Sequence, residues 1–193
     1  MLGQLPKTLN VNGKSYNINS DYRNIFRILA AFKDDELKDA EKALVCLRRL
    51  YTDFRLIPGE DYEEAYRQAV RFIDYNAENV NPKKHPKTVD LEKDEHLLFP
   101  AVNKVAGQEI RLLPYLHWWT FVGYFQSIDK DDLYSYVILI RHKKATHEKL
   151  EKAERKFYEA NKGIIDFMPA RNSRQRVDDF FRAIYERTEG GEQ

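Results

Sequence analysis

Apolar and polar residues alternate near the start of the chain, on both sides of the dipeptide Asn12-Gly13. The apolar positions in this alternation are Leu9, Val11, Tyr16 and Ile18. Asn-Gly favours a two-residue turn because both residues tolerate positive φ angles. The pattern therefore predicts a small β-hairpin, and since a lone hairpin is unstable, the hairpin must pack on another element.

Beyond the hairpin, apolar residues recur three and four positions apart, which is the spacing of one face of an α-helix. This spacing predicts helices over about 20–32, 34–51, 60–75, 94–106, 114–127, from 131 onward, and over about 173–187. The predicted fold class is mainly α: an irregular helical domain of about seven helices with a small N-terminal β-hairpin. We expect residues 1–142 to form the hairpin and the helical core, and residues 143–193 to form charged C-terminal helices packed as an appendage rather than as a certain separate domain.

Polar and special residues mark the expected ends of these helices. Ser20 is expected to cap the first helix, and Asp34-Asp35 to open the second. Gly107 is expected to end the fourth helix, because glycine readily adopts the left-handed conformation found there. Pro114 is suited to the first position of the helix that carries both tryptophans.

Composition narrows the classes of partner. The 193 residues are 42% hydrophobic and 33% charged, which is typical of a globular chain, and the formal net charge is +1. This balance gives no overall basic field, so we expect no nucleic-acid partner, although a local basic patch remains open. No run approaches the about 20 apolar residues of a membrane span, so no membrane association is expected. The single Cys46 and the polar start "MLGQLPKTLN" favour a reducing cytoplasm.

Motifs of known chemistry are missing from the sequence. Neither GxGxxG, GxxxxGK[ST], GxSxG nor HExxH occurs, and one cysteine cannot build a thiolate zinc site. Three carboxylate pairs, Asp34-Asp35, Glu63-Glu64 and Asp131-Asp132, fall in the first turns of predicted helices, where negative charge is favourable. An acid/base role for such a pair is the less favoured alternative. We therefore expect no catalytic residues, no cofactor and no metal, and hence no enzyme.

The segment 115–125, "YLHWWTFVGYF", contains both tryptophans. On a helical projection Trp118 lies in the middle of the apolar arc and is predicted to be a core residue. His117 lies off that arc and is expected to be a hydrogen-bonded histidine rather than a ligand. Trp119 lies at the margin, where it could pack under a neighbouring element or act as an aromatic anchor for a partner. Trp119 is therefore a candidate partner-binding residue.

A second candidate surface is a narrow heptad-like stripe, which we call the seam. Its positions step by four and three residues and comprise Thr146, Leu150, Ala153, Phe157, Ala160 and Ile164. Its bulky members, Leu150, Phe157 and Ile164, are candidate partner-binding residues. Packing of the seam against its own domain is slightly favoured, and self-association into a homo-oligomer is the alternative.

Two motifs carry a family resemblance: "DYRNIFRIL" at 21–29, and "LHWWTFVGYFQSI" at 116–128, which precedes "YSYVILIRHKKATHEKLEKAERKFYEANKG". Their order resembles the bacteriophage gene product fifteen family of Gram-positive siphophages and prophages, over roughly residues 10–165. The matching residues, expected to define the fold rather than to catalyse, are Asp21, Tyr22, Arg23, Leu116, His117, Trp118, Trp119, Phe121 and Arg141.

The resemblance implies a tail-assembly chaperone in the host bacterial cytoplasm. Such a protein would bind the phage tape-measure protein, and possibly the tail-tube protein, and would keep the tape-measure protein soluble during tail morphogenesis. Two alternatives stay open. The first is a structural tail or connector component retained in the virion, and the second is a small enzyme or nucleic-acid binder.

Overall fold

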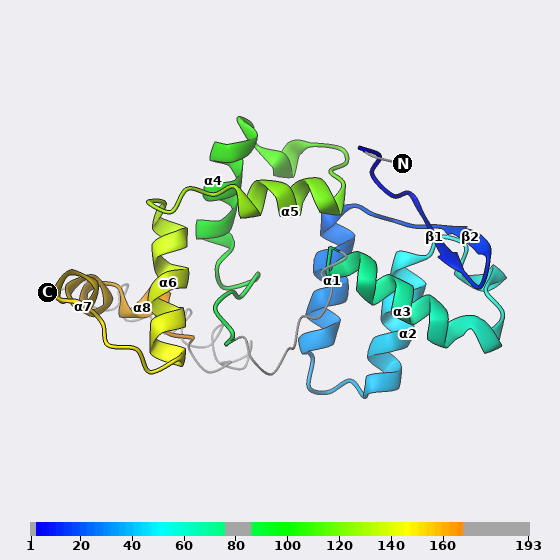
Figure 1. Ribbon diagram of the computed structural model, residues 1–193, viewed down its shortest axis with the longest axis horizontal. Helices are drawn as coiled ribbons and strands as arrows, with labels where there is room; N and C mark the ends of the chain where they lie inside the picture. The colour runs from blue at the N-terminus through cyan, green and yellow to red at the C-terminus, as the bar shows by residue number, and fades with distance from the viewer. Residues whose placement is uncertain (1–2, 76–85, 168–193) are drawn as a thin grey trace, which may run out of the picture. The chain divides into compact units, whose positions relative to one another are not determined.

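The structure is a computed structural model that describes residues 3–75 and 86–167. These residues form eight α-helices, α1 to α8, and one antiparallel pair of strands at the N-terminus (Figure 1). The predicted fold class, mainly helical with a small N-terminal hairpin, is therefore confirmed. The predicted helix over 173–187 lies outside the described residues.

The described residues divide into two compact units, and the division lies between Leu139 and Ile140. The boundary falls within α6 (Leu133–Ala145), where the sequence pattern had suggested a boundary after residue 142. In the ranges 3–75 and 86–167, no helix combines the length and the apolar composition that a membrane crossing requires.

The hairpin consists of β1 (Thr8–Val11) and β2 (Lys14–Asn17). Its turn residues Asn12 and Gly13 have φ angles of 47° and 87°, as the Asn-Gly dipeptide predicts. Val11 and Tyr16 are buried, and β1 contacts α3 (Tyr62–Ile73). The hairpin is thus stabilised by packing on a helix rather than by its own ladder.

The first two helices begin at other residues than predicted. In α1 (Tyr22–Lys33) the N-cap is Asp21, whose carboxylate accepts from the Arg23 N–H at 2.9 Å, and not Ser20. The Ser20 hydroxyl instead lies 2.7 Å from the Tyr115 hydroxyl. The helix α2 spans Asp39–Leu50 rather than opening at Asp34-Asp35. Asp34 accepts from the Glu36 N–H at 2.9 Å, and this local bond holds a turn there in place of a helix.

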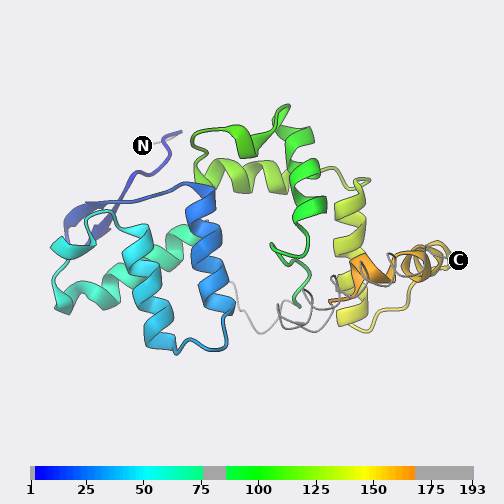
Figure 2. The ribbon, with the colours of Figure 1, turned by 180° about the vertical axis from the view of Figure 1, so that it is seen from behind.

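The core of the first unit lies between α1, α2 and α3, which lie side by side with the hairpin next to α3 (Figures 1 and 2). Short 3-10 turns, η1 (Phe54–Leu56) and η2 (Gly59–Asp61), lead into α3. The buried Tyr51 hydroxyl donates to the Ala65 carbonyl at 2.8 Å, so the polar end of a core side chain is satisfied. Core positions on these three helices are Tyr22, Ile25, Ile28, Cys46, Leu47, Leu50, Ala65, Ala69, Phe72 and Ile73.

The helix α4 (Glu95–Ala106) contains Pro100 and ends at Gly107, whose φ angle of 67° confirms the predicted stop. After η4 (Ile110–Leu112), the helix α5 spans Trp118–Gln126 and does not begin at Pro114. The reason is a long-range pairing: the Tyr22 N–H donates to the Leu116 carbonyl at 3.0 Å, and the Trp118 N–H donates to the Ser20 carbonyl at 2.7 Å. This pairing holds the chain before Trp118 extended.

Candidate partner-binding site

Both tryptophans donate hydrogen bonds to the carboxyl end of α3. The indole Nε1 of Trp118 lies 2.8 Å from the Ile73 carbonyl oxygen, and that of Trp119 lies 3.0 Å from the Phe72 carbonyl oxygen. The last carbonyl groups of a helix lack the usual donor four residues later and require another partner when they are buried. The Phe72 carbonyl also accepts from the Tyr75 N–H at 3.2 Å. The tryptophan pair therefore fixes the start of α5 against the end of α3.

Trp118 is a core residue, as predicted, with 8% of its surface exposed. Its ring stacks on Phe121 at a centroid distance of 5.7 Å and meets the edge of Phe26 at 6.2 Å. The side chain thus combines a large apolar contact with a satisfied N–H, which is how buried tryptophan usually occurs.

Trp119 is half-buried and packs on its own chain. Its ring stacks on Phe72 at 5.7 Å and contacts the edge of Tyr75 at 5.1 Å. Tyr75 remains 42% exposed. One face of the Trp119 ring and its indole N–H therefore bind the end of α3. A partner-binding role for Trp119 stays a prediction.

His117 caps α5 from a buried position. Its Nδ1 accepts from the Trp119 backbone N–H at 3.0 Å, and its Nε2 lies 2.9 Å from the Pro6 carbonyl oxygen. Together these bonds require a neutral ring protonated on Nε2. Burial lowers the pKa of His117 below its ordinary value, the nearby Lys7 charge adds to this, and the bond to Pro6 opposes it. The predicted hydrogen-bonded histidine is thus a helix cap.

The two motifs that carry the family resemblance pack against each other. Tyr22 stacks on Phe121 at 5.1 Å with an angle of 5° between the rings. Asp21 accepts from the Leu116 N–H at 3.2 Å, and the Arg23 guanidinium donates to the carbonyls of Leu113 and Pro114. These contacts join residues at least 90 positions apart, which supports a fold-defining role for the motif residues.

Arg141 has a comparable role in the second unit. Its side chain is buried, and its guanidinium donates to the carbonyls of Ile165 and Ile164 at 2.8 Å and 2.6 Å. These are the last two residues of α8 (Lys162–Ile165). The cation also lies 4.3 Å from the centre of the Phe167 ring. Arg141 therefore connects α6 to the end of α8.

The predicted seam does not lie on one helix. After α6 the chain turns at Thr146, whose hydroxyl donates back to the His142 carbonyl at 3.0 Å, and at His147, which has a φ angle of 59°. A new helix, α7 (Lys152–Ala160), starts where the Glu154 carboxylate accepts from the Glu151 N–H at 2.8 Å. These local bonds interrupt the helix while leaving the apolar spacing intact.

The three seam candidates consequently occupy three different elements. Leu150 lies in the turn before α7, Phe157 on α7 and Ile164 on α8, and all three are half-buried. The Phe157 carbonyl accepts from the Asn161 side chain at 2.9 Å, and the Ile164 carbonyl accepts from Arg141. Leu150 lines a groove in the second unit, and Phe157 and Ile164 are not among the residues that line this groove.

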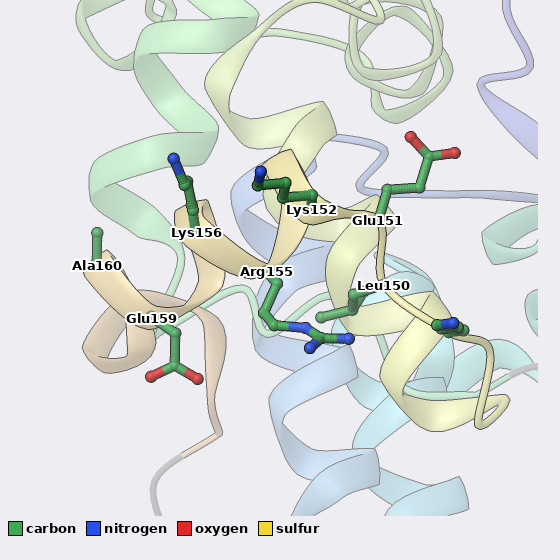
Figure 3. Close-up of a pocket in the computed structure, with 8 residues that line it drawn as sticks. Leu150, Glu151, Lys152, Arg155, Lys156, Glu159 and Ala160 are labelled. Atoms are coloured by element: carbon green, nitrogen blue, oxygen red, sulfur yellow. The ribbon is translucent and has the colours of Figure 1, made fainter.

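This groove runs along the solvent-facing side of α7 and has a volume of about 890 Å³ (Figure 3). Its apolar residues are Leu150 and Ala160, and its rim is made of charged side chains: Lys149, Glu151, Lys152, Arg155, Lys156 and Glu159. The opposite side of α7 faces its own unit, because Glu154 is buried and Lys143 binds its carboxylate at 2.5 Å. We regard this groove, which we call the α7 groove, as the candidate binding site.

The helical spacing of Lys152, Arg155 and Lys156 could have indicated this basic face from the sequence. When the charge is averaged over residues 141–162, however, the glutamates of the same segment cancel the lysines and arginines, and the basic face is not apparent. Two of these glutamates are already paired with lysine side chains in the structure. Glu154 faces inward and pairs with Lys143, and Glu159 pairs with Lys162 at 2.6 Å.

The thiol and the paired carboxylates, which are the side chains most able to react, have structural roles. The Cys46 thiol is buried, and burial raises its pKa to about 12, so it stays protonated. Glu63 and Glu64 lie in the first turn of α3, as predicted, and Asp132 accepts from the Tyr134 N–H at 3.0 Å next to the start of α6. The described residues contain no group of three His, Cys, Asp or Glu side chains placed to hold a metal ion.

Comparison with known proteins gives one match. The model of the family described as Bacteriophage Gp15 protein matches residues 1–167. No curated protein and no solved structure matches the chain.

Proposed function

The chain belongs to the Bacteriophage Gp15 protein family, and from this membership we propose that it is a tail-assembly chaperone that binds the tape-measure protein during tail morphogenesis. The family match is the observation that carries the proposal, because it covers most of the chain and identifies it as a bacteriophage protein. On this proposal the protein acts by reversible binding and without catalysis, in the cytoplasm of the host.

The α7 groove supplies a site of suitable chemistry. An amphipathic helix binds a groove by laying its apolar face on apolar side chains while its polar flanks meet the rim. Leu150 and Ala160 provide the apolar contact, and the lysine and arginine residues of the rim favour a helix with acidic flanks. A tape-measure protein is long and helical, so many such helix turns are available along it.

Reversibility follows from the small apolar surface of this site. One leucine and one alanine bury little area, so a single groove binds weakly and can be released as tail-tube subunits replace the chaperone. Several copies bound along one long partner hold it through the summed affinity of many weak contacts. A homo-oligomer of the chain would have the same effect.

Co-expression tests the proposal. The full chain is produced together with the tape-measure protein of the same phage, and the soluble fraction of the tape-measure protein is measured with and without the chain. We expect the tape-measure protein to become soluble and to co-purify. Lack of both rescue and complex would contradict the proposal.

Mass spectrometry of purified virions distinguishes the chaperone proposal from the alternative, a structural tail or connector component retained in the virion. A chaperone is absent from finished particles or present in trace amounts. A stoichiometric quantity in the particle would instead support the structural role.

A further inference from the structure

A second concave surface lies on the first unit, where the chain leaves α2. It has a volume of about 660 Å³, and its lining comprises Arg48, Tyr51, Thr52, Asp53, Phe54, Arg55 and Leu56. We call it the η1 hollow, because this lining includes all of η1. Leu56 is 65% exposed, so the hollow presents an apolar side chain to solvent.

The lining of the η1 hollow has a net positive charge, from two arginines and one aspartate. Arg48 and Arg55 are exposed, and neither forms an ion pair with another described residue. The Asp53 carboxylate accepts from the Asn17 side chain at 2.8 Å and from its backbone N–H at 3.3 Å, so it is bound to the hairpin. Two guanidinium groups beside an exposed leucine therefore favour a partner segment that brings carboxylates.

The opposite end of α2 has the complementary charge. The chain between α1 and α2 contains Asp34, Asp35 and Glu36 in succession, and all three are exposed. We call these three residues the acidic turn. Over the wider range 33–42 there are five acidic and three basic residues, a net charge of −2. Asp34 accepts from the Glu36 backbone N–H, and in the part of the chain that the structure describes no cation pairs with the carboxylates of the acidic turn.

The acidic turn does not reach the η1 hollow of its own chain. Both lie on the first unit, and α2 separates them: the turn precedes its first residue, and the hollow surrounds its carboxyl end (Figure 1). The 12 residues of this helix span about 18 Å, several times the length of an ion pair. The Asn19 N–H donates to the Leu50 carbonyl at 2.7 Å, which fixes the carboxyl end of α2 beside the hairpin. A contact between turn and hollow therefore requires two copies of the chain.

We infer that the η1 hollow binds the acidic turn of a second copy of this chain, with the carboxylates of the turn against Arg48 and Arg55 and the turn covering Leu56. Each copy has one turn and one hollow, so the contact can repeat from copy to copy. Because the charges on both sides are exposed, the contact is weak and depends on salt. The inference concerns self-association through the first unit and does not depend on the proposed function.

Sedimentation velocity of the purified full chain tests this at increasing protein concentration. We expect the average mass to rise with concentration at about 0.1 M salt and to return towards the monomer at about 1 M salt, where exposed charges are screened. A hollow variant, Arg48→Gln with Arg55→Gln, removes the two cations, and a turn variant, Asp34→Asn, Asp35→Asn with Glu36→Gln, removes the three carboxylates. Each should weaken self-association about tenfold at the lower salt concentration, which is the effect of losing about two exposed ion pairs.

A mixture of the two variants identifies the surfaces in contact. The hollow variant retains an acidic turn and the turn variant retains a hollow, so the two should bind each other more tightly than either binds itself. Leu56→Ser should weaken self-association at both salt concentrations, because it removes apolar contact and leaves the charge unchanged.

The matched control is Arg71→Gln with Lys130→Gln, which removes two exposed positive charges elsewhere on the same unit and should associate as the wild type does. Circular dichroism checks that each variant is folded. A wild-type chain that stays monomeric at every concentration would overturn the inference. Association that neither the hollow variant nor the turn variant weakens, or a mixture of the two that forms no complex, would overturn it as well.

Discussion

The indole N–H of Trp118 donates to the carbonyl oxygen of Ile73 over 2.8 Å, which joins the first residue of α5 to the last residue of α3. The adjacent Trp119 makes the equivalent bond to Phe72, the preceding residue of α3. Two neighbouring tryptophans thus satisfy two neighbouring carbonyls at a helix end. This geometry explains the Trp-Trp pair in the sequence without invoking a ligand.

The Trp118→Phe substitution tests the value of this bond. The ring contact with Phe121 is largely kept, but the Ile73 carbonyl loses a buried partner. We expect the free energy of unfolding to fall by about 1–3 kcal/mol, measured by urea denaturation. Trp118→Ala, which also leaves a cavity, should cost about 3–5 kcal/mol.

Trp119→Ala should destabilise the chain less than Trp118→Ala, because Trp119 is only half-buried. If its exposed part contacts the tape-measure protein, the same substitution should weaken co-purification of that partner at equal expression. Trp119→Tyr, which keeps an aromatic ring on Phe72, serves as the matched variant. Equal losses of stability at the two tryptophans would remove the distinction between a core residue and a marginal one.

The hairpin and the helical class could be predicted because Asn12-Gly13 and the 3.6-residue spacing act locally. The start of α5 could not, since residues 114–117 are held extended by Ser20 and Tyr22, which lie far away in the sequence. The expectation of one continuous helical stripe along the seam was wrong for a different reason. Apolar spacing continues through Thr146 and His147, while a side-chain bond and a left-handed residue end the helix there.

Acidification should destabilise the fold through His117. Its pKa is lower in the folded state than the ordinary value near 6.5, because burial disfavours the charged ring. The unfolded state therefore binds the proton first. The stability contributed by neutral His117 is complete above about pH 6.5 and is lost as the pH falls towards the lower folded pKa.

Thermal melts between about pH 7.5 and pH 5 measure this effect. His117→Asn retains a side-chain acceptor for the Trp119 N–H but does not titrate, so it should flatten the dependence over this range. Unchanged pH dependence in the Asn variant would assign the effect to other groups.

Arg141→Lys should loosen α8 although the charge is kept. A lysine cannot bind both the Ile164 and Ile165 carbonyls with the geometry of a guanidinium. We expect faster amide hydrogen exchange in residues 162–166, measured by mass spectrometry, with little change in α1 to α3. The neighbouring exposed His142→Gln is the control and should leave exchange at α8 unchanged.

Partner binding through the α7 groove should depend on salt and on two kinds of residue. The basic rim attracts an acidic helix through exposed charges, which are screened when the Debye length falls from about 10 Å at 0.1 M salt to about 3 Å at 1 M. The double substitution Arg155→Gln, Lys156→Gln removes the net positive charge of the rim, so it should abolish most of the salt dependence and weaken capture of the tape-measure protein in a pull-down. Leu150→Ser should weaken capture at every salt concentration, because it removes apolar contact and leaves the charge of the groove unchanged. The exposed Arg71→Glu is the matched control on the first unit and should bind as the wild type does. Circular dichroism checks that each variant is folded. If capture is insensitive to the substitutions at all three groove residues, the binding surface lies elsewhere on the chain. The next surface to substitute would then be Trp119 with Tyr75.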